Sequence, residues 1–175
     1  SSLPGPRNVQ DTHYYSRHYR QRLRAEVMLD AIVGITRVPE SFSGMPPGSR
    51  AKELWTTRIG SLFLDTFGRP DPNQDPPCER TPETTVVQSL HLMNSPNLQR
   101  KLTHSGGSIK RLLARHSENA ELVEELYLTC YSRSPTEEEM ETALDYMRRD
   151  GFQRDKAVED LAWSLLNSVE FIFNH

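Results

Sequence analysis

The chain has 175 residues, a formal net charge of −3 and an apolar content of 35%, which is enough to bury a core without a disulfide or a metal ion. Positive and negative residues are interspersed, so no basic field is available to hold phosphate backbones, and we expect no nucleic-acid partner. No apolar run approaches the roughly 20 residues of a spanning helix, so we also expect no membrane insertion.

The opening residues 1–6 read Ser-Ser-Leu-Pro-Gly-Pro, and no initiator methionine precedes them. This composition is typical of a linker. We therefore interpret residues 1–18 as a linker or extended arm, and residues 19–175 as a single helical domain that forms the C-terminal part of a larger protein. The preceding domains of that parent chain are then its expected partners.

Two helices are predicted in the first half of the chain. Apolar residues at four-residue intervals predict a helix over 19–36 with one buried stripe, formed by Leu23, Val27, Ala31 and Ile35. A short helix is predicted over 58–67 with Gly68 as a left-handed stop and with Leu62, Phe63 and Phe67 facing inward. Weak alternation over 59–67 leaves a strand as the alternative. The Pro- and Gly-rich segments between and after them predict long ordered loops.

The second half has clearer helical periodicity. Helices are predicted over 81–104 with a bend at Ser95, over 109–116, from Glu121 to Ser134, and from a capping box at Thr136 to Gly151. The last helix is predicted to run unbroken from about residue 155 nearly to the end of the chain. One face of this helix carries Val158, Leu161, Ala162, Leu165, Val169 and Ile172. Short connections indicate an antiparallel arrangement, so the fold class is all-α: an irregular multi-helix bundle with long ordered loops in its N-terminal half.

Chemically versatile side chains concentrate in the predicted loops between Asp65 and Arg80. Asp65, Glu79 and Cys78 are the candidate catalytic residues, because carboxylates can act as general acids or bases and a thiolate as a nucleophile. Arg69 and Arg80 are candidate binding residues. The structural alternative is that the two arginines pair with Asp65 and Glu79 and simply hold the loops together.

His91 and Asn94, on the predicted 81–104 helix, complete the candidate binding residues. No pair of the six histidines has the i,i+4 spacing of a helical zinc site, so we expect no metal. The two cysteines, Cys78 and Cys130, are far apart in sequence and fit no haem, iron–sulfur or zinc motif. We therefore expect no cofactor in this chain. A disulfide between the two cysteines and two free thiols remain as alternatives.

Several segments in a fixed order carry a family resemblance. They are residues 24–27 (RAEV), 60–70 (GSLFLDTFGRP), 78–80 (CER), 88–94 (QSLHLMN), 132–136 (SRSPT) and 165–175 (LLNSVEFIFNH). Together they resemble the C-terminal domain of planctomycete cytochrome-associated proteins, catalogued as domain of unknown function 1553. Members often have Cys-x-Cys-Glu-Arg where this chain has Pro76 before Pro77 and Cys78, so one expected cysteine is missing.

The resemblance implies an exported parent, located in the periplasm or at the cell surface, with a possible haem-binding segment elsewhere in that parent. It implies no catalytic residues. The missing cofactor motifs and the strongly amphipathic helices lead us to expect a non-catalytic assembly or scaffold module, and the chain alone is not expected to be an enzyme. The alternative hypothesis is that the Asp65–Arg80 loops contribute to a hydrolytic or glycan-binding site that other domains complete.

Overall fold

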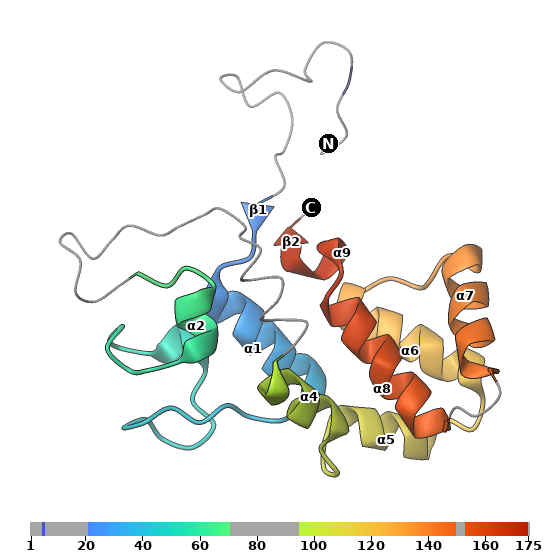
Figure 1. The fold of residues 1–175 in the computed structure, drawn as a ribbon, viewed down its shortest axis with the longest axis horizontal. Coiled ribbons are helices and arrows are strands. Elements are labelled where there is room, and N and C mark those ends of the chain that lie inside the picture. Colours follow the sequence, from blue (N-terminus) through green and yellow to red (C-terminus); the bar gives the residue numbers. More distant parts are fainter. Residues whose placement is uncertain (1–4, 6–20, 71–94, 150–152, 175) are drawn as a thin grey trace.

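The computed structural model describes residue 5 and residues 21–70, 95–149 and 153–174 of the chain. These residues form helices, and their only strand pairing joins two short end segments (Figure 1). The all-α class is therefore confirmed. In chain order the elements are β1 (Gln21–Arg22), α1 (Ala25–Thr36), η1 (Ala51–Glu53), α2 (Leu62–Thr66), α4 (Pro96–Thr103), α5 (Ser108–Arg115), α6 (Asn119–Tyr131), α7 (Glu137–Met147), α8 (Arg154–Leu166), α9 (Val169–Ile172) and β2 (Phe173–Asn174).

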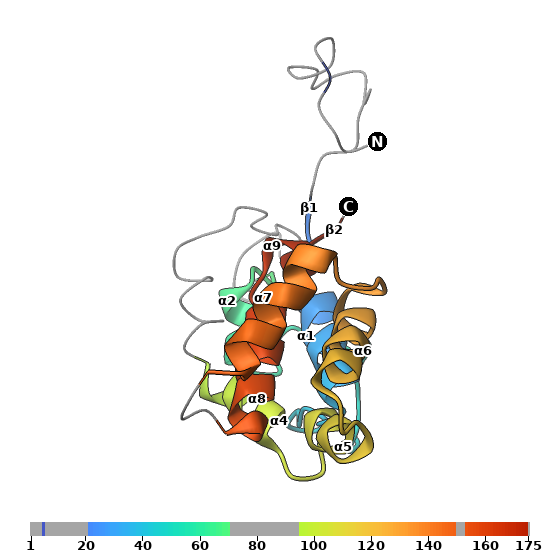
Figure 2. The same ribbon diagram turned by 90° about the vertical axis from the view of Figure 1, so that its right-hand side faces the viewer.

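Helix α8 lies at the centre of the packing. It contacts α4, α5, α6, α7 and α9, and it lies among these helices in Figures 1 and 2. Its buried residues include the consecutive Ala157, Val158 and Glu159, and successive helical residues point about 100° apart. Burial therefore extends around much of the helix, and α8 links the α6–α7 pair to the N-terminal half.

The N-terminal half is built around α1, which contacts η1, α2, α4 and α5. The helix ends at Arg37, whose φ of 57° is left-handed and whose N–H bonds to the carbonyl of Val33. Long loops follow, as expected. Asp30 of α1 holds one of them, because its carboxylate accepts the N–H groups of Ala51 and Lys52 at 2.6 and 3.2 Å.

The predicted buried stripe of the first helix is confirmed at Ile35, which is buried, and wrong at Val27, which is 47% exposed. Leu23 and Ala31 are partly buried against the core, and the buried residues outside the predicted stripe are Met28, Leu29 and Ile32. The helix also begins six residues later than expected, because residues 21–23 are extended and pair with the C-terminal end. Two overlapping sets of regularly spaced apolar residues run along this segment. Tertiary packing buries mainly the set that the four-residue pattern did not identify.

The predicted helix over 58–67 shortens to α2, and no strand forms there. Ser61 caps α2 by accepting the N–H of Leu64 at 3.4 Å, and Gly68, with φ of 83°, terminates the turn as expected. Leu64 and Phe67 are buried, but Leu62 is 74% exposed rather than inward. The Ser61 cap sets the start of the helix, which rotates Leu62 to the surface.

The predicted C-terminal helix is interrupted. Asn167 ends α8, and Ser168 begins α9 by accepting the N–H of Phe171 at 3.1 Å and the hydroxyl of Tyr131 at 2.7 Å. Val169, predicted to be buried, is 58% exposed. A serine that caps a new helix and also bonds a neighbouring helix stabilises the break over a continuous helix.

The other helices of the second half follow the prediction closely. Helices α4 to α7 lie where the periodicity placed them, and Thr136 and Glu139 form the expected reciprocal capping box. The predicted helix over residues 81–94 and the loop over 71–77 lie outside the described residues. None of the described helices has the length and apolarity needed to cross a membrane.

The two ends of the described domain meet in a short antiparallel pair. Gln21 lies opposite Asn174 and Arg22 opposite Phe173, and the N–H of Leu23 donates to the carbonyl of Ile172 at 2.9 Å. The Arg22 guanidinium also donates to the carbonyl of Phe67 at 3.0 Å. These bonds hold the C-terminal end of the described residues beside α1 and α2.

The core assignment can be tested with two leucines of α6. Leu126 is fully buried and Leu128 is 42% exposed. We expect Leu126→Ala to lower the free energy of unfolding by about 2–5 kcal/mol, because it leaves a cavity, and Leu128→Ala to change it by less than about 1 kcal/mol. Urea denaturation of both variants measures the difference. Equal losses would show that α6 does not bury the face described here.

Candidate functional site

The structure describes two of the seven predicted site residues. Asp65 lies in α2, and Arg69 follows the turn at Gly68. The other five, Cys78, Glu79, Arg80, His91 and Asn94, lie outside the described residues, so their roles as site residues stay predictions.

Asp65 and Arg69 form an ion pair. The Nε and Nη2 atoms of Arg69 donate to the same Asp65 oxygen, Oδ1, at 3.1 and 2.6 Å. The Arg69 side chain is 4% exposed and that of Asp65 54%. This is the structural alternative expected for the pair, with one carboxylate oxygen committed to a guanidinium.

One part of Arg69 remains without a partner. Its Nη1 atom is buried and makes no hydrogen bond within the described part of the chain. A buried charged donor that lacks a partner is energetically costly. Arg69 also borders a cavity of about 290 Å³, here called the α1 pocket, whose lining residues are Arg24, Glu26, Val27, Ala51, Lys52, Leu54, Thr56, Thr57 and Arg69.

Three segments build the α1 pocket. The first turn of α1 contributes one wall, η1 and the residues after it contribute a second, and Arg69 closes the pocket from the end of α2. Asp30 fixes the position of η1 through the N–H groups of Ala51 and Lys52. The pocket thus depends on ordinary helix packing for its shape.

Sequence reasoning identified Arg69 but missed the pocket residues Arg24, Lys52, Thr56 and Thr57. Arg24 belongs to one of the segments that carry the family resemblance, and Arg69 belongs to another. The structure brings these two segments together at the α1 pocket. Nothing in the sequence spacing distinguishes Lys52 or the two threonines from ordinary surface residues.

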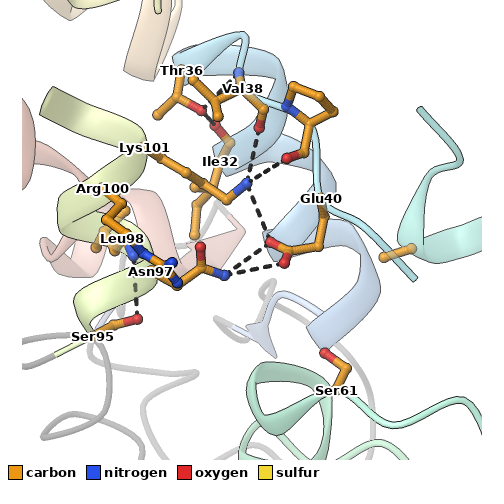
Figure 3. A network of polar contacts seen from close by, with 12 residues as sticks. Ile32, Thr36, Val38, Glu40, Ser61, Ser95, Asn97, Leu98, Arg100 and Lys101 are labelled. Carbon is orange, nitrogen blue, oxygen red and sulfur yellow. Dashed lines mark hydrogen bonds and ion pairs between the residues drawn. The ribbon is translucent and has the colours of Figure 1, made fainter. Parts of the chain in front are cut away.

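A second polar network surrounds the buried Lys101 of α4, as Figure 3 shows. The ammonium of Lys101 donates to the carbonyls of Val38 and Pro39 at 2.9 and 3.1 Å, and it lies 3.2 Å from a carboxylate oxygen of Glu40. The amide of Asn97 donates to both oxygens of Glu40 at 3.2 and 3.0 Å. All three donors of the ammonium are engaged, so this network ties the loop after α1 to α4.

A third network centres on Arg133, in the loop between α6 and α7. Its guanidinium makes two bonds of 2.8 Å to Glu139 and two of 2.7 Å to Glu170. Hydrogen bonding to Arg133 lowers the pKa of Glu139 to about 2, and the same bonds raise the pKa of Arg133. Because Glu170 belongs to α9, the pair of bidentate contacts joins the α6–α7 turn to the C-terminal end.

A hollow of about 600 Å³ lies along α7 and α8. Aromatic residues Tyr127, Tyr146 and Trp163 contribute to its lining, together with Glu139 and Asp160. Tyr146 donates to Asp160 at 3.0 Å, and Asp160 also accepts from Lys156 at 2.7 Å. Glu139 is bonded to Arg133, so these two carboxylates of the hollow are engaged within the fold.

Cys130 is a free thiol rather than half of a disulfide. Burial raises its pKa to about 12, so it remains protonated and unreactive at neutral pH. Within the described ranges, no three His, Cys, Asp or Glu side chains gather as metal ligands would.

Fold and site together define a helical domain in which the described residues form a basic pocket between α1, η1 and α2. A family model described as PSD1, protein of unknown function (DUF1553), matches residues 6–147, from the N-terminal segment to the end of α7. The chain belongs to this family, which confirms the family resemblance. No curated protein and no solved structure matches the chain. The link to planctomycetes and to cytochromes stays a prediction.

The depressed pKa of Glu139 predicts how stability depends on pH. In the unfolded chain a glutamate titrates near 4.3, so its contribution is complete above about pH 4.5 and is lost as the pH falls towards 2. We expect Glu139→Gln to lower the melting temperature by about 2–4 °C at pH 7, because this partly exposed pair contributes about 1 kcal/mol. The difference from the wild type should shrink to zero near pH 2.

The matched control is Glu138→Gln, which changes the exposed neighbouring carboxylate that does not contact Arg133. Thermal melts between pH 2 and pH 7 should leave this variant close to the wild type throughout. If the melting temperatures of the wild type and of Glu139→Gln differed by the same amount at every pH, this result would contradict the stabilising role of the Glu139–Arg133 contact.

Proposed function

We propose that the chain is a non-catalytic assembly module that docks onto other domains of a larger exported protein. The observation that carries this proposal is the exposure of two large apolar side chains, one between η1 and α2 and the other at the first residue of α2. Trp55 is 78% exposed and Leu62 is 74% exposed. Exposed tryptophan is uncommon on a free surface and frequent at protein interfaces, where it becomes an anchor.

The charged groups support the same proposal. Arg133 is bonded to two glutamates, Lys101 to Glu40, and Arg69 to Asp65. These contacts hold the fold together, which is the role of structural ion pairs. Part of what the N-terminal half leaves available to another domain is the apolar surface of Trp55 and Leu62.

The proposal includes an exported location, in the periplasm or at the cell surface, and a chain that contains no cofactor of its own. Its partners are the preceding domains of the parent. The hydrolytic alternative has weaker support, since one oxygen of Asp65 already accepts two bonds from Arg69. A glycosidase needs two carboxylates that face each other across a cleft.

Association in trans tests the proposal. The 175-residue chain is mixed with the separately expressed remainder of its parent, and binding is followed by calorimetry and by Trp55 fluorescence in a Trp163→Phe background. Docking is expected to shift the Trp55 emission to shorter wavelength as the indole leaves water. Trp55→Ala and Leu62→Ala should each weaken binding at least 10-fold, as anchor residues do, with unchanged melting temperatures.

The matched control is Leu128→Ala, another exposed leucine, located on α6. It should bind like the wild type. The assembly proposal fails if the two pieces do not associate, or if association is equally insensitive to changes at residues 55, 62 and 128.

A further inference from the structure

The lining of the α1 pocket is basic although the whole chain is acidic. Arg24, Lys52 and Arg69 bring three positive charges to it, and Glu26 brings one negative charge, in a chain whose net charge is −3. The exposed Arg24 and Lys52 make no side-chain hydrogen bond or ion pair with other described residues. Concentrated positive charge in a concave site favours an anionic ligand.

Arg69 provides the most specific feature of the pocket. A guanidinium has five N–H donors, and the contact with Asp65 uses the Nε edge and one hydrogen of Nη2. The remaining edge consists of Nη1 and the second hydrogen of Nη2. Nη1 is buried and has no partner in the described part of the chain, and this edge has the shape that binds two oxygens of a planar or tetrahedral oxyanion.

The first turn of α1 lies at the same pocket. Its N-cap residue is Arg24, whose side chain accepts no hydrogen bond from the helix, so the N-terminal end lacks the usual side-chain acceptor. The partial positive charge of a helix N-terminus favours an anion. Helix end and buried guanidinium are independent features that attract the same chemical group.

The size of the pocket indicates more than a bare ion. Its volume of about 290 Å³ is roughly ten times the volume of one water molecule. Beside the cations it offers the hydroxyls of Thr56 and Thr57 and the apolar side chains of Val27 and Leu54. We propose that the α1 pocket binds an oxyanion group, a carboxylate or a sulfate, carried on a small polar body such as a sugar ring.

Calorimetric titration of the 175-residue chain at constant ionic strength tests this proposal. Sodium sulfate and sodium glucuronate are the probes, and glucose is the neutral counterpart of glucuronate. Both anions should bind saturably at one site, with dissociation constants of about 0.1–10 mM, and glucose should not. The ratio of the two constants shows whether the free oxyanion or the sugar acid is preferred.

Variants locate the site. Arg24→Gln and Lys52→Gln each remove an exposed cation and should weaken binding of both anions about 3- to 10-fold, and Arg69→Lys, which removes the fork, at least 10-fold. Arg111→Gln, an exposed cation on α5, is the matched control and should bind like the wild type. If Arg69→Lys fails to fold, the two exposed variants decide the question.

Three outcomes would overturn the proposal. One is the absence of saturable binding to the wild type. Another is unchanged affinity in both Arg24→Gln and Lys52→Gln. The third is an equal loss in Arg111→Gln, which would indicate diffuse attraction to surface charge instead of a site.

Discussion

The burial of α8 is the constraint on which the rest of the architecture depends. Ala157, Val158 and Glu159 are buried in succession, so the helix has neighbours around much of its circumference. Ala157 and Ala162 allow those neighbours to approach closely, and the one charged member, Glu159, is paired with Lys110 of α5 at 3.0 Å. Helix α8 contacts α4 and α5 of one group and α6 and α7 of the other, so it joins the two groups beside the direct contact of α5 with α6.

Polar contacts then fix the positions of those loops and chain ends that core packing alone does not determine. Arg133 joins the α6–α7 turn to α9 through Glu170, and the residues after α9 pair with Arg22 beside α1. Arg22 in turn bonds to Phe67 at the end of α2. A continuous series of contacts therefore connects the second half of the chain to the wall of the α1 pocket. The shape of the pocket thus depends on both halves of the described structure.

Where local signals were strong, the sequence was sufficient. The Thr136 capping box and the Ser95 start of α4 were predicted, because caps act within one helical turn. The failures have non-local causes. The face of α1 depends on contacts with distant elements, and the break at Ser168 depends on the hydroxyl of Tyr131, far away in sequence. Periodicity cannot report either contact.

The candidate site shows the same division. Arg69 could be singled out because it lies in a loop rich in functional groups, but its exposed companions Arg24 and Lys52 come from α1 and η1, which only folding brings together. The positive charges of Arg24 and Lys52 indicate a binding site only in combination with the buried, unpartnered Nη1 atom of Arg69. The burial of that atom is a property of the fold and cannot be predicted from sequence spacing.

The position of Trp55 links the two proposals physically. Its chain neighbours Leu54 and Thr56 both line the α1 pocket, while its own side chain is exposed. A domain that covers Trp55 therefore lies close to the pocket and changes its access to solvent. If it excludes water there, the attraction between Arg69 and an oxyanion strengthens, since Coulomb interactions grow as the local dielectric constant falls. Binding of the partner and binding of the anion would then favour each other to the same degree, as linkage requires.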